Sequence, residues 1–140
     1  MGGIIMTQEQ KDLLLKDLCE RLPYGVKAKV LVEDILHYDY SSEEGGFING
    51  IENINNGLFV IQCREDSYVL SYDEFKPYLR PMSSMTDSEA IEWHKTTFGQ
   101  RWITEDNIER CIDWLNAHHF DFRGLIEKGL ALDATGLNIY

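Results

Sequence analysis

The stretch FINGIENINNGLFVIQC, residues 47–63, decides the class of fold. Two runs in it, 47–54 and 58–63, are rich in Ile, Val and Phe, which favour extended strands. Between them stands Asn-Asn-Gly at 55–57, and these residue types adopt the positive φ angles that a tight hairpin turn requires. The stretch therefore predicts two antiparallel strands joined by a short turn.

The segments on either side of this hairpin extend the sheet. Residues 26–33, VKAKVLVE, alternate between apolar and charged side chains, which is typical of an antiparallel strand with one buried face. Residues 64–67 predict a second turn before another strand at 68–72. The segment 34–46 is polar and ends in glycine, so we expect a long loop there, and we expect Asp73 to begin a single helical turn. This order predicts a small SH3-like antiparallel β-barrel or a bent sheet.

An amphipathic helix is expected before the sheet. Thr7 and Gln10 have the spacing of a capping box, leucines then recur at helical intervals, and Pro23 stops the pattern. We therefore predict a helix over residues 8–22, whose leucine-rich face packs on the next module because such a face stabilises a helix by being buried.

Three helices are predicted after the sheet, beyond a connector at residues 80–85. The first runs from Thr86 to Phe98, and Glu89 completes a capping box with Thr86. The second covers residues 105–119 and is capped by Thr104. The third runs from Arg123 to Lys128 and is ended by Gly129. The apolar tail 130–140 is expected to pack against the protein. The chain is thus predicted to be an α+β protein, with a helix and β module at 1–80 and a helical region at 81–140 that pack as one compact unit.

The composition is that of an acidic globular protein. The 140 residues include 44% hydrophobic ones and carry a formal net charge of −11. Residues 1–80 hold 8 Lys and Arg against 14 Asp and Glu, a balance of −6, and residues 81–140 hold 5 against 10, a balance of −5. Neither half offers a basic face for phosphates, so we expect no direct binding of nucleic acid. The negative charge instead permits docking on a basic protein.

The cysteines and the apolar segments predict a soluble cytoplasmic protein without a metal or another cofactor. Cys19, Cys63 and Cys111 lie far apart and are odd in number, so they form neither a zinc motif nor a disulfide framework. The start of the chain lacks the basic residues of a signal peptide, and no apolar run has the length of a transmembrane helix. We therefore expect no membrane contact.

The stretch WLNAHHFDFRGLIEKGLAL, residues 114–132, holds the best candidates for chemistry. In a hydrolase, His119 would act as a general base oriented by Asp121, and a metal enzyme would use His118 as well. Adjacent histidines on one helix, however, point in different directions and do not easily share an ion. Histidine near the C-terminus of a helix is also favoured by the helix dipole. A structural role is therefore the preferred interpretation, and a binding role for His119 and Asp121 comes second.

The acidic and aromatic part of the predicted loop is the best candidate for a recognition surface, because the long early loop of a small barrel often lines its ligand groove. The candidate binding residues there are Tyr38, Asp39, Tyr40, Glu43 and Glu44. A solvated loop without a partner is the alternative. Trp93, Trp102 and Trp114 are expected to pack helices together, and they become interface anchors if they are exposed.

Three blocks of the sequence resemble a known family. KDLLLKDLCERLPYGVK (11–27), KPYLRPMSSMT (76–86) and WLNAHHFDFRGLIEKGLALDA (114–134) are similar, in this order, to blocks of small proteins that phages, prophages and mobile elements of gut anaerobic bacteria encode. The resemblance covers about a third of the chain directly. It implies an accessory gene and the cytoplasm of a bacterial host, and it brings no catalytic residue with it.

These observations leave three hypotheses for the function. We expect first a non-enzymatic protein-binding or accessory protein of phage or mobile-element origin, which engages a basic host or defence protein. A small metal-dependent hydrolase that uses His118, His119 and Asp121 is the alternative. A structural or assembly component, in which the chain forms a homo-oligomer, is the third.

Overall fold

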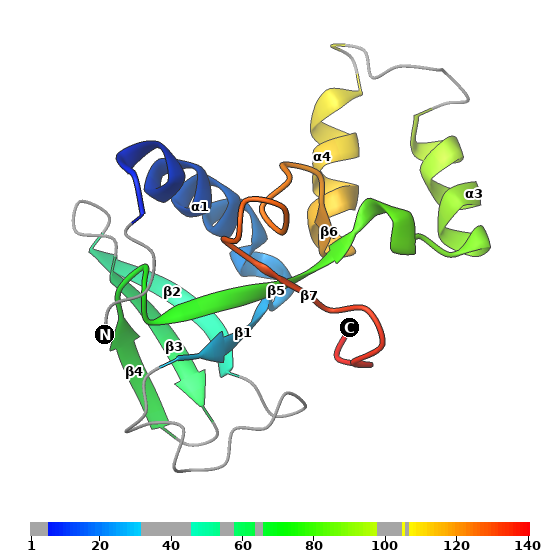
Figure 1. Cartoon of the computed structure of the whole chain (residues 1–140). Coiled ribbons are helices and arrows are strands. Elements are labelled where there is room, and N and C mark those ends of the chain that lie inside the picture. The colour runs from blue at the N-terminus through cyan, green and yellow to red at the C-terminus, as the bar shows by residue number, and fades with distance from the viewer. Residues whose placement is uncertain (1–5, 32–45, 54–57, 64–65, 98–104, 106) are drawn as a thin grey trace.

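The structure is a computed structural model, and it describes residues 6–31, 46–53, 58–63, 66–97, 105 and 107–140. The chain is an α+β protein, as predicted, with an N-terminal helix, a small mixed sheet and then further helices (Figure 1). The elements are α1 (Gln8–Arg21), η1 (Leu22–Tyr24), β1 (Lys27–Val30), β2 (Gly46–Asn53), β3 (Leu58–Cys63), β4 (Asp66–Leu70), β5 (Phe75–Pro81), η3 (Met82–Ser84), α3 (Asp87–Thr96), α4 (Ile108–Ala117), β6 (Phe120–Asp121) and β7 (Leu132–Asp133).

The sheet is open. Its strand order is β4-β3-β2-β1-β5-β6, and β7 also pairs with β5. The pairs among β1 to β5 are antiparallel, as predicted, whereas β6 and β7 each run parallel to β5. Within the described part of the chain, the edge strands β4 and β6 do not pair with each other, so the barrel, one of the two predicted forms of the β module, is wrong.

The hairpin of β2 and β3 confirms the prediction from the stretch 47–63. The two strands are antiparallel, with Ile48 opposite Ile61, and the turn residues 55–57 lie outside the described residues. β4 begins at Asp66, two residues before the predicted strand, because its ladder with β3 extends further than the polar sequence indicates.

β5 is a long strand that the sequence pattern does not predict, and the two-residue strands β6 and β7 are not predicted either. Pro77 lies inside it, and proline has no N–H to donate to a ladder. Its first half nevertheless pairs with β1, where Ala28 lies opposite Pro77 and Val30 lies opposite Phe75. The segment before it contains a hydrogen-bonded turn, in which the Glu74 N–H donates to the Ser71 carbonyl over 3.1 Å, rather than the predicted helical turn.

α1 and the C-terminal segment pack on the sheet around one hydrophobic core. Leu14 and Leu18 of α1 are almost fully buried, as the leucine pattern predicts. The other buried members of the cluster are Val26, Ala28, Val30, Leu70, Phe75, Leu79, Leu125, Leu130 and Ala131. The tail is therefore packed down, as expected, and it contributes Leu130 and Ala131 to the core.

Both predicted capping boxes are present. The Gln10 N–H donates to Thr7 Oγ1 over 3.1 Å at the start of α1, and the Glu89 N–H donates to Thr86 Oγ1 over 3.2 Å at the start of α3. α4 begins at Ile108, three residues after the predicted start at 105, and the expected cap residue 104 lies outside the described residues.

Within the described residues, three helices follow β5, namely η3, α3 and α4, so their number matches the prediction. α3 and α4 are two of the predicted helices, whereas η3 is not one of them. The predicted helix at 123–128 is a turn closed by hydrogen bonds from Lys128 N–H to the Gly124 carbonyl and from Leu130 N–H to the Leu125 carbonyl. Gly129 ends this turn with a φ of 74°, which is the left-handed conformation expected of a cap.

None of the helices in the described part of the chain is long and apolar enough to cross a membrane.

Candidate functional site

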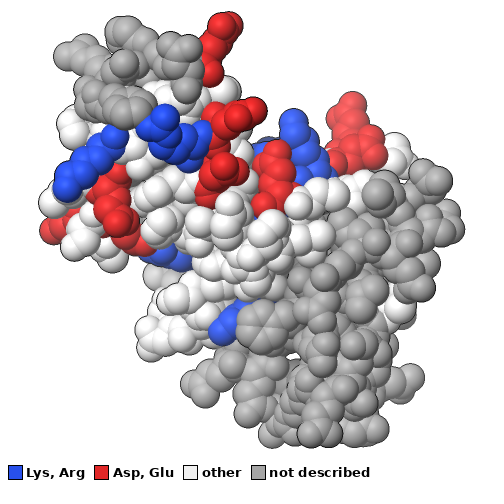
Figure 2. All heavy atoms as spheres, turned by 180° about the vertical axis from the view of Figure 1, so that it is seen from behind, with Lys and Arg blue, Asp and Glu red and all other residues white. Residues whose placement is uncertain are grey.

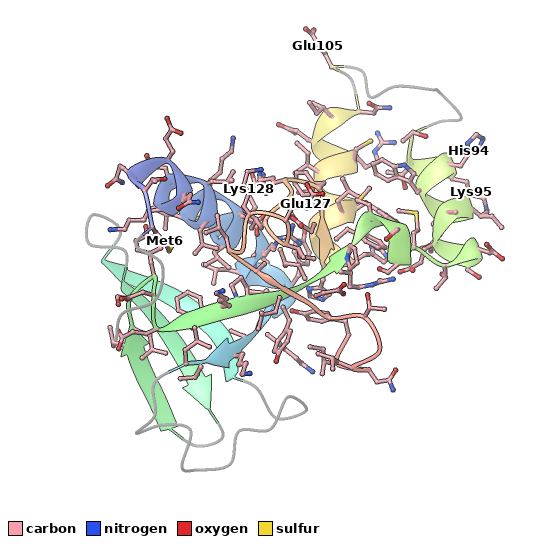
Figure 3. All side chains as sticks on the ribbon, viewed as in Figure 1. Met6, His94, Lys95, Glu105, Glu127 and Lys128 are labelled. Carbon is pink, nitrogen blue, oxygen red and sulfur yellow. The ribbon has the colours of Figure 1, made fainter. Side chains whose placement is uncertain are left out.

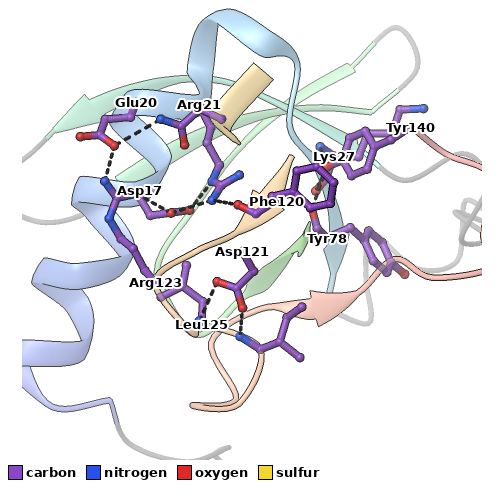
Figure 4. A network of polar contacts seen from close by, with 12 residues as sticks. Asp17, Glu20, Arg21, Lys27, Tyr78, Phe120, Asp121, Arg123, Leu125 and Tyr140 are labelled. Carbon is purple, nitrogen blue, oxygen red and sulfur yellow. Dashed lines mark hydrogen bonds and ion pairs between the residues drawn. The ribbon is translucent and has the colours of Figure 1, made fainter. Parts of the chain in front are cut away.

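A network of ionic contacts lies where α1 meets β6 (Figure 4). Asp17 and Arg21 are one helical turn apart on the leucine side of α1, and both are fully buried. Arg21 Nε donates to Asp17 Oδ2 over 2.7 Å, and Arg21 Nη2 donates to Asp17 Oδ1 over 3.1 Å. The same Nη2 donates to the Phe120 carbonyl oxygen over 2.6 Å. This pair therefore joins α1 to β6.

Arg123 brings a second guanidinium to Asp17. Its Nη1 donates to Asp17 Oδ1 over 2.7 Å, and its Nη2 donates to Glu20 Oε2. Burial favours the neutral form of Glu20, but the hydrogen bond and the positive charge of Arg123 outweigh it, so the pKa of Glu20 is lowered. Two carboxylates and two guanidiniums thus hold α1 against the turn that follows β6.

Asp121 closes that turn and is not placed for acid–base chemistry. Its Oδ1 accepts from the Leu125 N–H over 2.8 Å, and its Oδ2 accepts from the Ile126 N–H over 2.9 Å (Figure 4). The residue is 9% exposed. Both carboxylate oxygens therefore accept hydrogen bonds from the backbone of residues 125 and 126. The acidic residue at this position thus has a structural role in the turn.

His118 also has a structural environment. Its ring stacks on Trp114 with a centroid distance of 4.0 Å, and its Nδ1 lies 2.8 Å from the Trp114 carbonyl oxygen. A carbonyl oxygen only accepts, so Nδ1 carries the proton and donates. Nε2 then faces Glu92 of α3 at 3.7 Å. His118 therefore caps the end of α4 and approaches α3.

His119 lies in a left-handed backbone conformation, with a φ of 63°. This conformation turns its side chain away from His118 and stacks it on Tyr140, with 3.6 Å between ring centroids and 11° between planes. Its main chain is held by the Arg80 N–H, which donates to the His119 carbonyl over 2.8 Å. Burial and then the charge of Arg21 disfavour the imidazolium and lower the pKa of His119 to about 4, with further contributions from the charges of Arg80, His118 and Lys27.

A loss of stability below pH 6.5 is the expected result of this lowered pKa. The unfolded chain protonates His119 near its ordinary pKa of about 6.5, whereas the folded chain resists protonation until about pH 4. The full stability therefore exists above pH 6.5, and it declines as the pH falls from 6.5 to 4. Between pH 7 and pH 5, a lowering of the pKa by this amount corresponds to a loss of about 2 kcal/mol of unfolding free energy. Because the side chain is partly exposed to solvent, we expect a loss of about 1 kcal/mol.

Urea unfolding at pH 7 and pH 5 measures this decline. His119→Asn is the control, because asparagine accepts the left-handed conformation but does not titrate. We expect the variant to lose less unfolding free energy than the wild type between the two pH values. An equal loss in both proteins contradicts the assignment to His119.

Tyr140 fixes the tail between β1 and β5. The Lys27 N–H donates to the Tyr140 hydroxyl oxygen over 2.7 Å, and the hydroxyl donates to the Tyr78 carbonyl over 2.7 Å (Figure 4). Lys27 and Tyr78 are the next pair after Ala28 and Pro77, so the hydroxyl stands where the β1–β5 ladder ends. Burial raises the pKa of Tyr140, so this hydroxyl stays protonated near neutral pH.

Arg80 and Glu89 join β5 to α3. The two side chains form a bidentate pair, with 2.6 Å from Nη2 to Oε1 and 2.7 Å from Nη1 to Oε2. The guanidinium also lies over the Phe120 ring, with its central carbon 4.2 Å from the centroid. The hydrogen bond from Arg80 lowers the pKa of Glu89 to about 2, against a smaller opposing effect of burial. A cavity of about 430 Å³ lies between this pair and residues 134–140 of the tail.

The structure does not bring the predicted chemical residues together. Within the described residues, no group of three or more His, Cys, Asp and Glu side chains is placed to hold a metal ion. His94 points away from α4 on the outer side of α3 (Figure 3). His119 contacts Tyr140 and Asp121 contacts the backbone, so the two residues serve separate parts of the fold.

Several of the predicted residues lie outside the described part of the chain. They are Tyr38, Asp39, Tyr40, Glu43, Glu44 and Trp102. Trp93 and Trp114 are described, and their rings meet between α3 and α4 with 5.3 Å between centroids, so these two pack helices together as predicted.

The residues with the strongest contacts are not among the predicted site residues. The spacing of Asp17 and Arg21 by four residues is the local signal for that pair. Asp17 comes three positions after Leu14 and Arg21 three positions after Leu18, which places both on the buried side of the helix. The contacts of Arg80 and Tyr140 have no such signal, because their partners come from distant segments.

Comparison with protein-family models, with curated proteins and with solved structures finds no match to this chain.

Proposed function

We propose that this chain is a non-enzymatic, protein-binding accessory protein of phage or mobile-element origin, which engages a basic protein in the cytoplasm of a bacterial host. One observation supports the proposal that the protein is not an enzyme. Both oxygens of Asp121, the acid that a hydrolase would need beside His119, accept hydrogen bonds from the backbone at Leu125 and Ile126. The hydrogen bonds of Asp121 thus go to the turn at residues 125 and 126, while the ring of His119 stacks on Tyr140 instead of being oriented by this acid.

The distribution of charge supports a basic partner. The fourteen residues of segment 32–45 include five acidic residues and no Lys or Arg. The acidic residues are Glu33, Asp34, Asp39, Glu43 and Glu44. This segment therefore carries −5 of the net charge of −11, together with the aromatic rings of Tyr38 and Tyr40. Tyrosine beside carboxylates is a composition suited to a cationic protein surface.

The described surface also supports a protein rather than a nucleic acid as partner. On the face in Figure 2, Lys and Arg side chains stand among Asp and Glu side chains instead of gathering in one area. Binding to a phosphate backbone depends on such a gathered basic area.

Affinity capture from host lysate tests the proposal with a matched pair of variants. The first variant is Asp39→Asn with Glu43→Gln and Glu44→Gln. The control is Glu105→Gln with Glu109→Gln and Asp113→Asn, which removes the same charge from three exposed residues. Glu109 and Asp113 lie in α4, and Glu105 precedes it (Figure 3). We expect the wild type and the control to capture the same basic protein at low salt, and the first variant to lose it, because attraction between exposed charges is local and screened by salt.

Two results contradict this proposal. One is the absence of any captured protein above background with the wild-type chain. The other is equal capture by the first variant, which shows that the acidic residues of segment 32–45 do not contribute to recognition.

A further inference from the structure

Residues 137–140, which follow β7 at the red end of the ribbon in Figure 1, form a strap beside β1 and β5. The side chains of Leu137 and Ile139 pack in a small hydrophobic cluster around Tyr78, and Lys27 Nζ donates to the Ile139 carbonyl oxygen over 2.6 Å. Within the described residues, this cluster shares no member with the main hydrophobic core. The strap can therefore leave the sheet as a local unit without opening the core.

Lys27 of β1 and Tyr78 of β5 stand opposite each other where the ladder between these strands ends. In the same register, the Leu31 N–H donates to the Glu74 carbonyl oxygen over 2.8 Å. Hydrogen-bonded pairs recur at every second residue of an antiparallel ladder, and Lys27 and Tyr78 are each four residues from that bond. Their backbone groups therefore stand at a position where two strands bond directly.

The Tyr140 hydroxyl is inserted at this position. The Lys27 N–H donates to the hydroxyl oxygen over 2.7 Å, and the hydroxyl donates to the Tyr78 carbonyl oxygen over 2.7 Å (Figure 4). When the strap leaves, the N–H and the carbonyl can pair with each other and complete the ladder. Release of the strap thus leaves neither backbone group without a partner, which removes a large part of its cost.

His119 presents its ring to the strap and is poorly placed to carry a second proton. The ring stacks on Tyr140 with 3.6 Å between centroids. Its Nδ1 is buried and has no hydrogen-bond partner within the described residues. An imidazolium donates from both ring nitrogens, so a buried Nδ1–H without an acceptor disfavours this form.

The charged groups around His119 also oppose its protonation. They are Arg21 of α1 with its partner Asp17, Lys27 of β1, Arg80 of β5 with its partner Glu89 of α3, and the neighbouring His118. Burial and then the positive charges lower the pKa of His119 to about 4. When the strap leaves, the ring gains contact with water, which favours the imidazolium. Protonation of His119 and release of the strap therefore favour each other.

We propose that residues 137–140 are a releasable strap: a proton on His119 detaches them as a unit, and the Lys27 N–H then bonds directly to the Tyr78 carbonyl oxygen. Release uncovers the Tyr78 side chain on β5. It also removes one wall of the cavity beside the Arg80–Glu89 pair, because Asn138, Ile139 and Tyr140 line that cavity. This device does not depend on the proposed contact with a basic protein.

Chemical-exchange saturation transfer in NMR, measured on the signals of residues 137–140, gives the population of the detached strap. Between pH 7 and pH 5.5 we expect this population to rise about threefold to tenfold, while the signals of Leu14 and Leu18 in the core do not change. His118→Gln is the matched control, because it removes the neighbouring titratable ring and keeps the rise. His119→Asn, or His119→Gly if the first does not fold, accepts the left-handed conformation without titrating and abolishes the rise.

Tyr140→Phe tests the inserted hydroxyl by a separate measurement. The variant keeps an aromatic ring but cannot bridge the two strands, so we expect a larger detached population at both pH values. We also expect a scalar coupling across a direct hydrogen bond from the Lys27 N–H to the Tyr78 carbonyl, which the wild type lacks at pH 7. Four results overturn the proposal: no rise in the wild type, a rise that persists without His119, a simultaneous change in the core signals, or no such coupling in a folded Tyr140→Phe variant.

Discussion

Replacement of Asp17 by Asn is expected to lower the unfolding free energy by about 3–5 kcal/mol, because it leaves the guanidinium of Arg21 buried without a full counter-charge. Arg21 has no exposed surface; apart from Asp17, its guanidinium donates to the Phe120 carbonyl oxygen and lies over the Phe122 ring, 5.6 Å from the centroid, and neither contact supplies a counter-charge. Domains of this size are stable by about 5–15 kcal/mol, so the variant loses a large share of the total stability. Urea unfolding followed by circular dichroism measures the change.

Glu20→Gln is the matched control for this prediction. It makes the same chemical change at the next carboxylate of the same network, also bound to Arg123, but the Glu20 side chain is 34% exposed. Water replaces the lost interaction there, so we expect a cost below about 1 kcal/mol. A larger loss for Glu20→Gln than for Asp17→Asn contradicts the view that burial of the Asp17–Arg21 pair controls stability.

Replacement of Glu89 by Gln is expected to lower the unfolding free energy by about 1.5–3 kcal/mol, because Arg80 loses a bidentate, charge-assisted partner. Glutamine still completes the capping box, so the loss reports the ion pair rather than the helix cap. The pKa of Glu89 is lowered from its ordinary value to about 2, so its contribution is present above about pH 4.5 and declines as the pH falls toward 2. Thermal or urea unfolding at pH 7 and pH 3 measures both effects.

Glu92→Gln on the same helix is the control for Glu89. Glu92 is 60% exposed and lies 3.7 Å from His118, so we expect a change below about 1 kcal/mol. If the two variants are equally stable, the Arg80–Glu89 pair does not hold α3 against β5.

The sequence predicts those parts of the fold that short-range patterns specify. The two capping boxes and the hairpin of β2 and β3 follow from residues three or four positions apart, and the structure contains all of them. The prediction of a closed barrel is wrong, and no local pattern indicates the observed pairing. The second half of β5 pairs with the two-residue strands β6 and β7, which come from the C-terminal part of the chain. β5 itself contains Pro77, a residue that argues against a strand in any local reading.

At the candidate site, the residue types point to residues with specific contacts, but these contacts hold the fold together and do not form a catalytic pair. Asp121 and His119 stand two positions apart in the sequence, which is the pattern of an acid that orients a base. The left-handed backbone at His119 turns its ring toward Tyr140, and Asp121 faces the following turn. Both contacts depend on tertiary packing, so no periodicity in the sequence indicates them.

The most direct test of the proposed function is the dissociation constant between the purified chain and its captured partner, measured for two variants. One variant is His118→Gln with His119→Asn, and the other is Asp39→Asn with Glu43→Gln and Glu44→Gln. Binding carried by segment 32–45 predicts that the histidine variant keeps its affinity within about threefold, whereas the acidic variant loses about tenfold or more. A folded histidine variant that loses the partner, beside an acidic variant that keeps it, contradicts the structural role assigned to the histidines and the binding role assigned to the acidic segment.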